Sequence, residues 1–206
     1  MGSLRDELRA RGFVHVARHV SADEFEALCT SLGTISARSE VALRKGARSY
    51  LASPEAVPFH TDFVVDVIAW RCEVQDPIAG ASLLLDARAV LATLSAVVET
   101  LLRNTRIEMR AAPGSAPHRR EVLQGVGCTE RLSFAPWLEP VGVGPRESAA
   151  YDDLRRAVTA AAQQARAVRL MPGEALLLDN GRFLHGRGPL PVDSRRRLSR
   201  RWIESP

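Results

Sequence analysis

The segment from Glu174 to Gly188 reads EALLLDNGRFLHGRG and sets the expectation for the whole fold. Glu174–Leu178 predicts a short strand, Asp179-Asn180-Gly181 a tight turn, and Arg182–His185 a second strand. Short runs of the same kind recur along the chain, at residues 13–16, 59–70, 71–74, 82–85, 131–134, 167–170 and 198–203. Many short strands separated by turns predict a mainly β protein, a double-sheet barrel with flanking α-helices.

Helical signals lie between these runs. Residues 4–11 predict a short helix ended by Gly12, and Ser21 with Glu24 forms a capping box for a helix that stops at Gly33. Apolar residues at helical spacing predict further helices over about 87–102 and 148–166. Residues 34–58 read as irregular, with a short strand near 49–51, and residues 111–118 (AAPGSAPH) as a mobile loop.

Composition limits the classes of protein. The 206 residues fit one domain, and apolar residues make up 46% with no run long enough to span a membrane. The N-terminus lacks the apolar core of a signal peptide, so we expect a cytoplasmic protein. Three cysteines without a CxxC pair argue against a disulfide framework or a cysteine-based zinc site. The net charge of +4 favours an anionic ligand, and the interspersed acidic residues argue against nucleic acid.

One tripeptide, His60-Thr61-Asp62, has the spacing of a metal site. Residues two apart on a strand project to the same side, so this imidazole and this carboxylate can reach one cation. His185, far away in the sequence, is a candidate third ligand. Two histidines and one carboxylate leave half of an octahedral coordination sphere open, which suits iron(II). Alone, the H-x-D pattern has little specificity.

An arginine-rich strand follows His185. In RRLSRRW, residues 196–202, alternation places Arg196, Leu198, Arg200 and Trp202 on one face and Arg197, Ser199 and Arg201 on the other. An arginine beside a metal can hold a carboxylate with two parallel hydrogen bonds. The strand therefore offers a clamp for a dicarboxylate co-substrate that chelates the metal at its other end.

Three segments together resemble a known family. They are VPFHTDFVVDVIAWRCEVQDPIAGASLLLDARAVLATLS, MPGEALLLDNGRFLHGRGPL and RRLSRRW. The chain is similar in them to the taurine dioxygenase and clavaminate synthase-like iron(II)/2-oxoglutarate oxygenases, and the resemblance weakens between about 103 and 147. It implies a double-stranded β-helix, the cupin-like jelly roll, as a single domain over residues 1–206, with about 103–147 inserted as substrate pocket and lid.

The resemblance also implies the site residues. His60, Asp62 and His185 are the implied iron ligands, and Arg200 is the implied clamp for 2-oxoglutarate, with Arg196 nearby and Ser82 in the place of the family's usual threonine. The choice among Arg196, Arg200 and Arg201 stays open, because the loop after His185 is short. Ala79-Gly80 departs from the usual Gly-Gly. A carboxylate at position 62 resembles hydroxylating rather than halogenating relatives.

The implied activity is hydroxylation of an unactivated C–H bond of a small molecule, an amino acid or biosynthetic intermediate of secondary metabolism. The implied cofactor is bound iron(II), the implied co-substrates are 2-oxoglutarate and O2, and succinate and CO2 are released. Desaturation, cyclisation and a non-catalytic anion- or nucleic-acid-binding barrel are the alternatives, and homo-oligomerisation stays open. Arg131, Phe134 and Trp137 are candidates for substrate contacts, with Arg110, Arg119 and Arg120 competing for the role of anion clamp.

Overall fold

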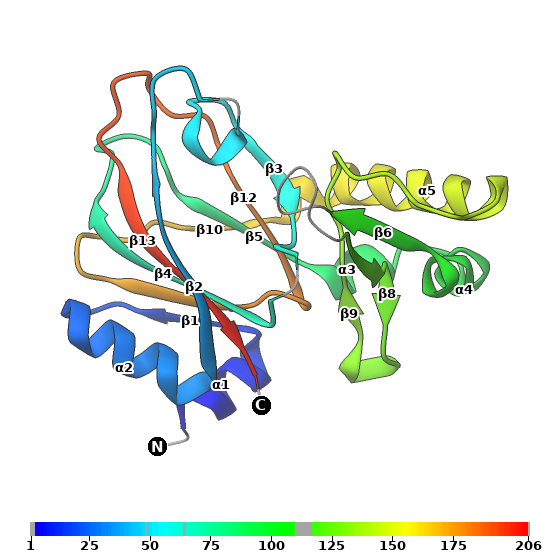
Figure 1. Ribbon diagram of the computed structural model, residues 1–206, viewed down its shortest axis with the longest axis horizontal. Helices are drawn as coiled ribbons and strands as arrows, with labels where there is room; N and C mark the ends of the chain where they lie inside the picture. Colours follow the sequence, from blue (N-terminus) through cyan, green and yellow to red (C-terminus); the bar gives the residue numbers. More distant parts are fainter. Residues whose placement is uncertain (1–2, 48, 64, 110–116, 206) are drawn as a thin grey trace.

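Two antiparallel β-sheets face each other in the computed structural model, which describes residues 3–47, 49–63, 65–109 and 117–205 (Figure 1). The five-stranded sheet has the order β1 (Phe13–Val16), β11 (Ala175–Asp179), β4 (Val67–Val74), β13 (Arg197–Glu204) and β2 (Thr34–Ala42). The four-stranded sheet has the order β10 (Arg166–Val168), β5 (Ser82–Asp86), β12 (Phe183–Arg187) and β3 (Val57–His60). Strand neighbours in both sheets are far apart in the sequence, as in a jelly roll.

Alternation along the strands separates two apolar layers. On β4, Ile68, Trp70 and Cys72 point between the two sheets and belong to the inner core. Val67 and Ala69 point to the outer side and pack in a separate cluster beneath the helices. Because successive side chains of a strand alternate between faces, one apolar strand contributes to both layers.

The N-terminal helices α1 (Leu4–Arg11) and α2 (Ala22–Leu32) cover that outer face of the five-stranded sheet (Figure 1). Both begin with a capping box, formed by Ser3 with Asp6 and by Ser21 with Glu24. Gly12 ends α1 with φ of 76°, a left-handed conformation that favours glycine. Both helices lie where the sequence predicted them.

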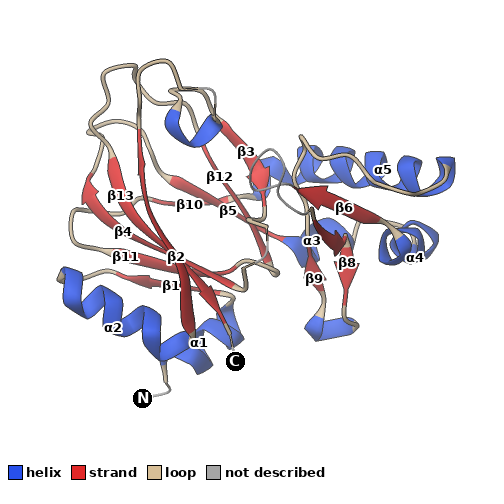
Figure 2. Ribbon diagram, in the orientation of Figure 1, coloured by secondary structure: helices blue, strands red, loops and turns tan. Residues whose placement is uncertain are grey.

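A second lobe lies beside the sheets (Figure 2). It contains α3 (Ala87–Leu91), α4 (Ala96–Asn104), α5 (Pro145–Ala161) and the short strands β6 (Arg106–Met109), β7 (His118–Glu121), β8 (Leu123–Gln124) and β9 (Arg131–Leu132). Its core joins the barrel through Leu85 and Leu184, which pack in the same cluster as Tyr151 and Leu154 of α5. Three 3₁₀ turns, η1 (Tyr50–Ala52), η2 (Gly127–Thr129) and η3 (Ala162–Gln164), complete the described elements.

Three sequence predictions differ from the structure, and a fourth lies mostly outside the described residues. The single helix over 87–102 is two helices, because Ser95 caps a new helix by accepting from the N–H of Val98. Residues 34–42 form strand β2 rather than an irregular segment, and residues 50–52 form a 3₁₀ turn rather than a strand. Most of the predicted loop 111–118 lies outside the described residues, and His118 begins β7.

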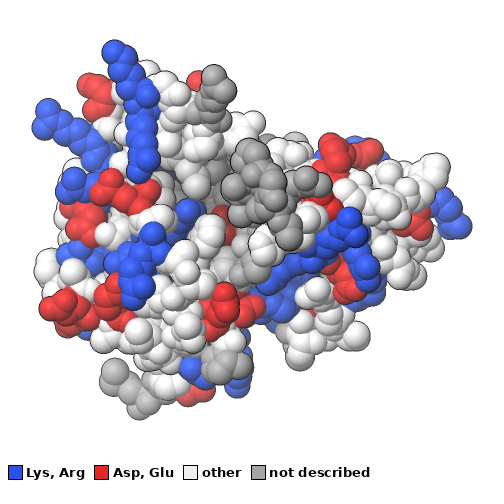
Figure 3. Space-filling model, in the orientation of Figure 1, with Lys and Arg blue, Asp and Glu red and all other residues white. Residues whose placement is uncertain are grey.

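The arginine-rich strand β13 sorts its side chains by face. Arg201 donates to Glu26 of α2 at 3.0 Å, and the Ser199 hydroxyl donates to Glu73 at 2.7 Å, both on the outer side. Arg196 and Arg200 point inward and are buried. Basic and acidic side chains lie side by side on the face seen in Figure 3. In the described part of the chain, no helix has the length and hydropathy of a membrane span.

Candidate metal centre

His60 and His185 come from neighbouring strands and face each other. His185 of β12 is paired in register with His60 at the end of β3, so the two imidazoles project from the same side of the sheet. Their ring centroids lie 4.3 Å apart, and both residues are buried. The Nδ1–H of His60 donates to the Pro58 carbonyl oxygen at 2.9 Å, which fixes the ring so that Nε2 faces Asp62 Oδ1 and can coordinate a cation there.

Asp62 follows directly after β3, where the side chain of Asn180 holds its backbone. The Asp62 N–H donates to Asn180 Oδ1 at 2.8 Å, and Asn180 Nδ2 donates to the carbonyl oxygens of Asp62 at 2.7 Å and Val65 at 2.8 Å. The pairing of β3 with β12 ends at His60, and the buried side-chain amide of Asn180 supplies the hydrogen bonds to the backbone that follows. Sequence reasoning assigned Asn180 to the turn before β12 and missed this contact with the Asp62 segment.

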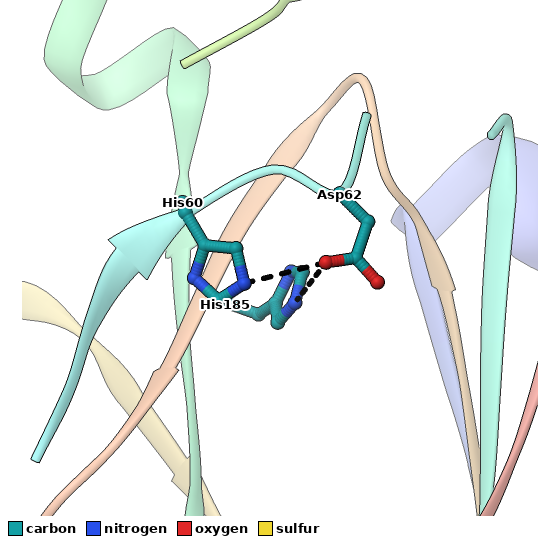
Figure 4. Close-up of side chains that lie close together, drawn as sticks. All are labelled: His60, Asp62 and His185. Atoms are coloured by element: carbon teal, nitrogen blue, oxygen red, sulfur yellow. Dashed lines mark ion pairs between the residues drawn. The ribbon is translucent and has the colours of Figure 1, made fainter. Parts of the chain in front are cut away.

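The three side chains point to a common centre (Figure 4). Asp62 Oδ1 lies 3.3 Å from His60 Nε2 and 3.8 Å from His185 Nε2. One ligand atom of each residue lies within 4.8 Å of the others, so one cation can contact all three. The structure therefore brings together the three residues expected to bind iron.

The protonation states suit a cation. Burial, together with the nearby His60, lowers the pKa of His185 to about 3, so its imidazole is neutral at neutral pH. Burial alone would raise the pKa of Asp62, but its hydrogen bond with His60 and the positive charge of Arg200 hold this pKa well below its usual range. A carboxylate and neutral imidazoles are the forms that bind metal ions.

The second oxygen of Asp62 is held from β13. Asp62 Oδ2 accepts from Trp202 Nε1 at 2.7 Å and from Arg200 Nη1 at 3.2 Å. Arg200 also donates from Nε to the Ser39 hydroxyl at 3.0 Å and stacks over the Trp202 ring. Its charge is therefore compensated by Asp62, and Oδ1 is left facing the histidines.

Arg196 is in a different situation. Its guanidinium is buried, and Nε has no hydrogen-bond partner among the described residues. Burial, together with the positive charge of Arg187, lowers the pKa of Arg196 to about 10. A narrow cavity connects Arg196 and Ser82 with His60 and His185. Gly80 makes room for this arginine, since a Cβ there would overlap Arg196 Cδ.

A larger cavity of about 380 Å³ opens on the other side of His60 and Asp62. Trp137, one of the candidates for substrate contacts, is among the residues that line it. The Trp137 ring lies 5.1 Å from the His60 ring and 5.5 Å from the Tyr50 ring, measured between centroids. The structure therefore places Trp137 beside the candidate metal centre.

The other candidates for substrate contacts lie elsewhere. Arg131 pairs with Asp66 and Asp179, at 3.3 Å in each case, and borders a separate cavity beside α1. Phe134 is buried in the core of the second lobe against Tyr151. Arg119 pairs with Glu108 on the β6–β7 ribbon, and Arg110 lies outside the described residues. Leu51, Met109 and Leu138 line the cavity instead, and no motif in the sequence marks them.

A jelly roll that gathers two imidazoles and a carboxylate defines a class, the non-haem iron oxygenases with a two-histidine, one-carboxylate centre. The family model described as "Taurine catabolism dioxygenase TauD, TfdA family" matches residues 1–202. The chain belongs to this family, which confirms the predicted oxygenase and the predicted fold. No protein of curated function matches the chain in a sequence comparison.

Solved structures agree on the fold. An asparagine oxygenase bound to Fe(II), 2S,3S-3-hydroxyasparagine and succinate superposes with a TM-score of 0.77 at 20% identity, covering 97% of this chain and 77% of that chain. The non-heme iron oxygenase OrfP bound to Fe gives 0.76 at 15% identity, with 98% and 78% covered. A putative alpha-ketoglutarate-dependent taurine dioxygenase from Burkholderia xenovorans gives 0.75 at 18% identity, with 100% and 85% covered.

Proposed function

We propose that the protein is an iron(II)- and 2-oxoglutarate-dependent dioxygenase that hydroxylates an unactivated C–H bond of a small molecule. The convergence of His60, Asp62 and His185 beside the buried Arg196, whose Nε has no hydrogen-bond partner among the described residues, carries this proposal. The asparagine oxygenase of similar fold, which binds Fe(II), a hydroxylated amino acid and succinate, supports the same reaction type.

The three side chains would hold the metal from one side. Each offers one ligand atom, and the donor set of two nitrogens and one carboxylate oxygen fits iron(II). The hydrogen bonds on His60 Nδ1 and on Asp62 Oδ2 fix the orientation of two of the ligands before a metal binds. Three protein ligands would leave coordination positions of the metal for 2-oxoglutarate and dioxygen.

Arg196 fits the far carboxylate of 2-oxoglutarate better than Arg200 does. Burying a guanidinium with an unpaired N–H group costs free energy, and a bound carboxylate that accepts from it would reduce that cost. Ser82 lines the same narrow cavity and can add a hydroxyl donor. Arg200, by contrast, already pairs with Asp62, so we assign it to holding the metal ligand.

Bound iron(II) with 2-oxoglutarate supplies the oxidising chemistry, in which dioxygen and the keto acid become CO2, succinate and the oxygen atom added to the substrate. The chain's own contribution is geometric. It keeps His185 neutral, holds Asp62 by one oxygen, and places the large cavity next to His60, so that a substrate C–H bond in the cavity would lie near a metal held by these residues.

Succinate formation tests the proposal. Purified protein supplied with iron(II), 2-oxoglutarate and air should convert 2-oxoglutarate to succinate slowly without substrate and faster with a correct one. His60→Ala and His185→Ala should abolish the iron-dependent part. If both variants, or protein stripped of iron, formed succinate as fast as the native protein with iron(II), the proposal would be wrong.

A further inference from the structure

The large cavity beside His60 is walled mainly by apolar side chains. Its described lining residues include Leu51, Val57, Phe63, Met109, Ala135 and Leu138. They come from the η1 segment, from β3 and the residues after it, from the end of β6, and from the loop before α5. At about 380 Å³ the cavity is near the lower end of the usual range for small-molecule sites, roughly 300–1,000 Å³.

Two aromatic side chains stand at this cavity with much of their surface open. Tyr50 is 46% exposed and Trp137 is 44% exposed, whereas most large apolar side chains of the described chain are buried. Their centroids lie 5.5 Å apart, and Trp137 continues the series to His60 at 5.1 Å. Tyr50 and Trp137 are in contact, and Trp137 lies next to His60. Their exposed ring faces form a surface on which a planar apolar group can stack.

The charges of the cavity are already paired. Among its described lining residues, Asp62 and Arg200 are the charged ones, and they are joined by a 3.2 Å ion pair. A free amino acid would bring an ammonium and a carboxylate, and burying each charge needs a partner of opposite sign. The described walls offer no second carboxylate for that ammonium.

We propose that the part of the substrate entering this cavity is neutral and carries an aromatic ring, which stacks on Trp137 with Tyr50 beside it. This inference rests on the proposed function, since it assigns the cavity to the molecule that is oxidised. It sets the chain apart from the asparagine oxygenase of similar fold, whose bound product is a polar amino acid. Trp137 and Tyr50 are then specificity-determining residues.

Calorimetric titration tests this inference. The full chain, loaded anaerobically with iron(II) and 2-oxoglutarate, is titrated with indole as the neutral aromatic probe and with L-asparagine as the zwitterionic probe. We expect indole to bind measurably and more tightly than L-asparagine. Trp137→Ala should weaken indole binding roughly fivefold or more, and Trp137→Phe should keep it within about twofold, because phenylalanine retains a stacking face. Met171→Ala, at an exposed residue outside the cavity, should bind indole as the native chain does.

The visible charge-transfer band of the iron(II)–2-oxoglutarate chelate, recorded in the same samples, separates the two levels of the account. If the band forms but L-asparagine binds more tightly than indole, the inference is overturned and the proposed function stands. The same holds if Trp137→Ala binds indole as tightly as the native chain. If the native chain gives no band, the proposed function fails, and the assignment of the cavity to a substrate fails with it.

Discussion

Asp62 uses its two carboxylate oxygens for different contacts. Oδ1 faces the two histidines, while Oδ2 accepts from Trp202 and Arg200. Partners that orient a metal-binding side chain commonly matter about 10–100-fold for metal affinity. If Asp62 binds the metal as proposed, Trp202 is a positioning residue, because it contacts Asp62 and not the metal itself.

Trp202→Phe removes the indole N–H donor and keeps an aromatic ring in place. We expect iron(II) affinity to fall about tenfold, since Oδ2 then loses its shorter hydrogen bond. An anaerobic iron(II) titration followed by calorimetry measures the change. Trp137→Phe is the matched control, because no hydrogen bond joins Trp137 to Asp62, and its iron affinity should match the native chain. Native affinity in Trp202→Phe would exclude the positioning role.

Substitutions of Arg196 and Arg200 are expected to weaken the binding of different ligands. Arg196→Gln should weaken 2-oxoglutarate binding about tenfold or more with little change in iron affinity, because a charge-assisted contact to the carboxylate is lost. Arg200→Gln should mainly weaken iron binding, because Asp62 loses its paired cation. Separate titrations of the two variants with iron(II) and then 2-oxoglutarate distinguish these effects. If Arg200→Gln weakened mainly 2-oxoglutarate binding and Arg196→Gln mainly iron binding, Arg200 would be the residue that binds the 2-oxoglutarate carboxylate.

At the scale of elements, Arg187 ties strand β12 to the η1 segment. Its guanidinium donates to the carbonyl oxygens of Gly188 at 2.7 Å, Glu55 at 3.0 Å, Ser53 at 3.1 Å and Tyr50 at 3.5 Å. Burial lowers the pKa of this arginine. The strand that carries His185 thus also fixes the segment that supplies Tyr50 to the cavity wall.

Arg187→Ala removes a buried side chain and leaves those partly buried carbonyl groups without their donor. We expect the free energy of unfolding to fall by about 2–4 kcal/mol, measured by urea denaturation at neutral pH. Arg197→Ala removes only an exposed ion pair with Glu40, between β13 and β2 of the five-stranded sheet. This variant should change the free energy of unfolding by less than about 0.5 kcal/mol. Equal losses in the two variants would show that the tether contributes nothing specific.

Local signals predicted the elements that they determine. The capping box at Ser21, the glycine after α1 and the alternation of β13 all carry their own physical cause, and these predictions agree with the structure. Strand β2 could not be found in this way. Of its side chains only Val41 is buried, so its sequence lacks an apolar face, and its pairing with β13 is a long-range contact. The break before α4 was missed because the apolar spacing continues through Ser95.

In the candidate site too, local sequence signals predicted some residues, whereas residues brought together by long-range contacts were missed. Spacing brought His60 and Asp62 together in the prediction, His185 was a candidate third ligand, and the family resemblance implied all three. The cavity walls depend on which loops meet in space, so Leu51 and Met109 carried no signal. Arg131 was a candidate for substrate contacts because an arginine can bind an anion, but Asp66 and Asp179 already occupy it. Those pairings join residues that lie far apart in the sequence.

At the scale of the whole molecule, Tyr151 holds the second lobe against the segment that borders the cavity. Its hydroxyl donates to the Ala135 carbonyl oxygen at 2.9 Å, and the side chain is fully buried. Burial raises the pKa of Tyr151 to about 12 and that of Cys29 to about 12. Both groups are therefore neutral in the folded chain well beyond the pH at which they ionise when unfolded.

These raised pKa values predict alkaline unfolding. A group whose pKa is higher in the folded state contributes stability below its unfolded pKa and loses it as pH rises through the folded value. Stability should fall from about pH 9 for Cys29 and from about pH 10 for Tyr151, continuing to about pH 12. Tyr151→Phe should be less stable at pH 7, by about 1 kcal/mol, but should lose less stability above pH 10. Urea denaturation at pH 7, 9, 10 and 11 measures both effects, and parallel curves for the two proteins would contradict the assignment to Tyr151.

The absorption spectrum of the chain mixed anaerobically with iron(II) and then 2-oxoglutarate tests whether His60, Asp62 and His185 share one metal ion. If His60, Asp62 and His185 hold one iron and leave room for a bidentate keto acid, the native chain develops the visible charge-transfer band of the chelate at one iron per chain. His60→Ala and His185→Ala then lack the band. A native chain without the band, or variants that keep it, would show that these three residues do not form such a centre.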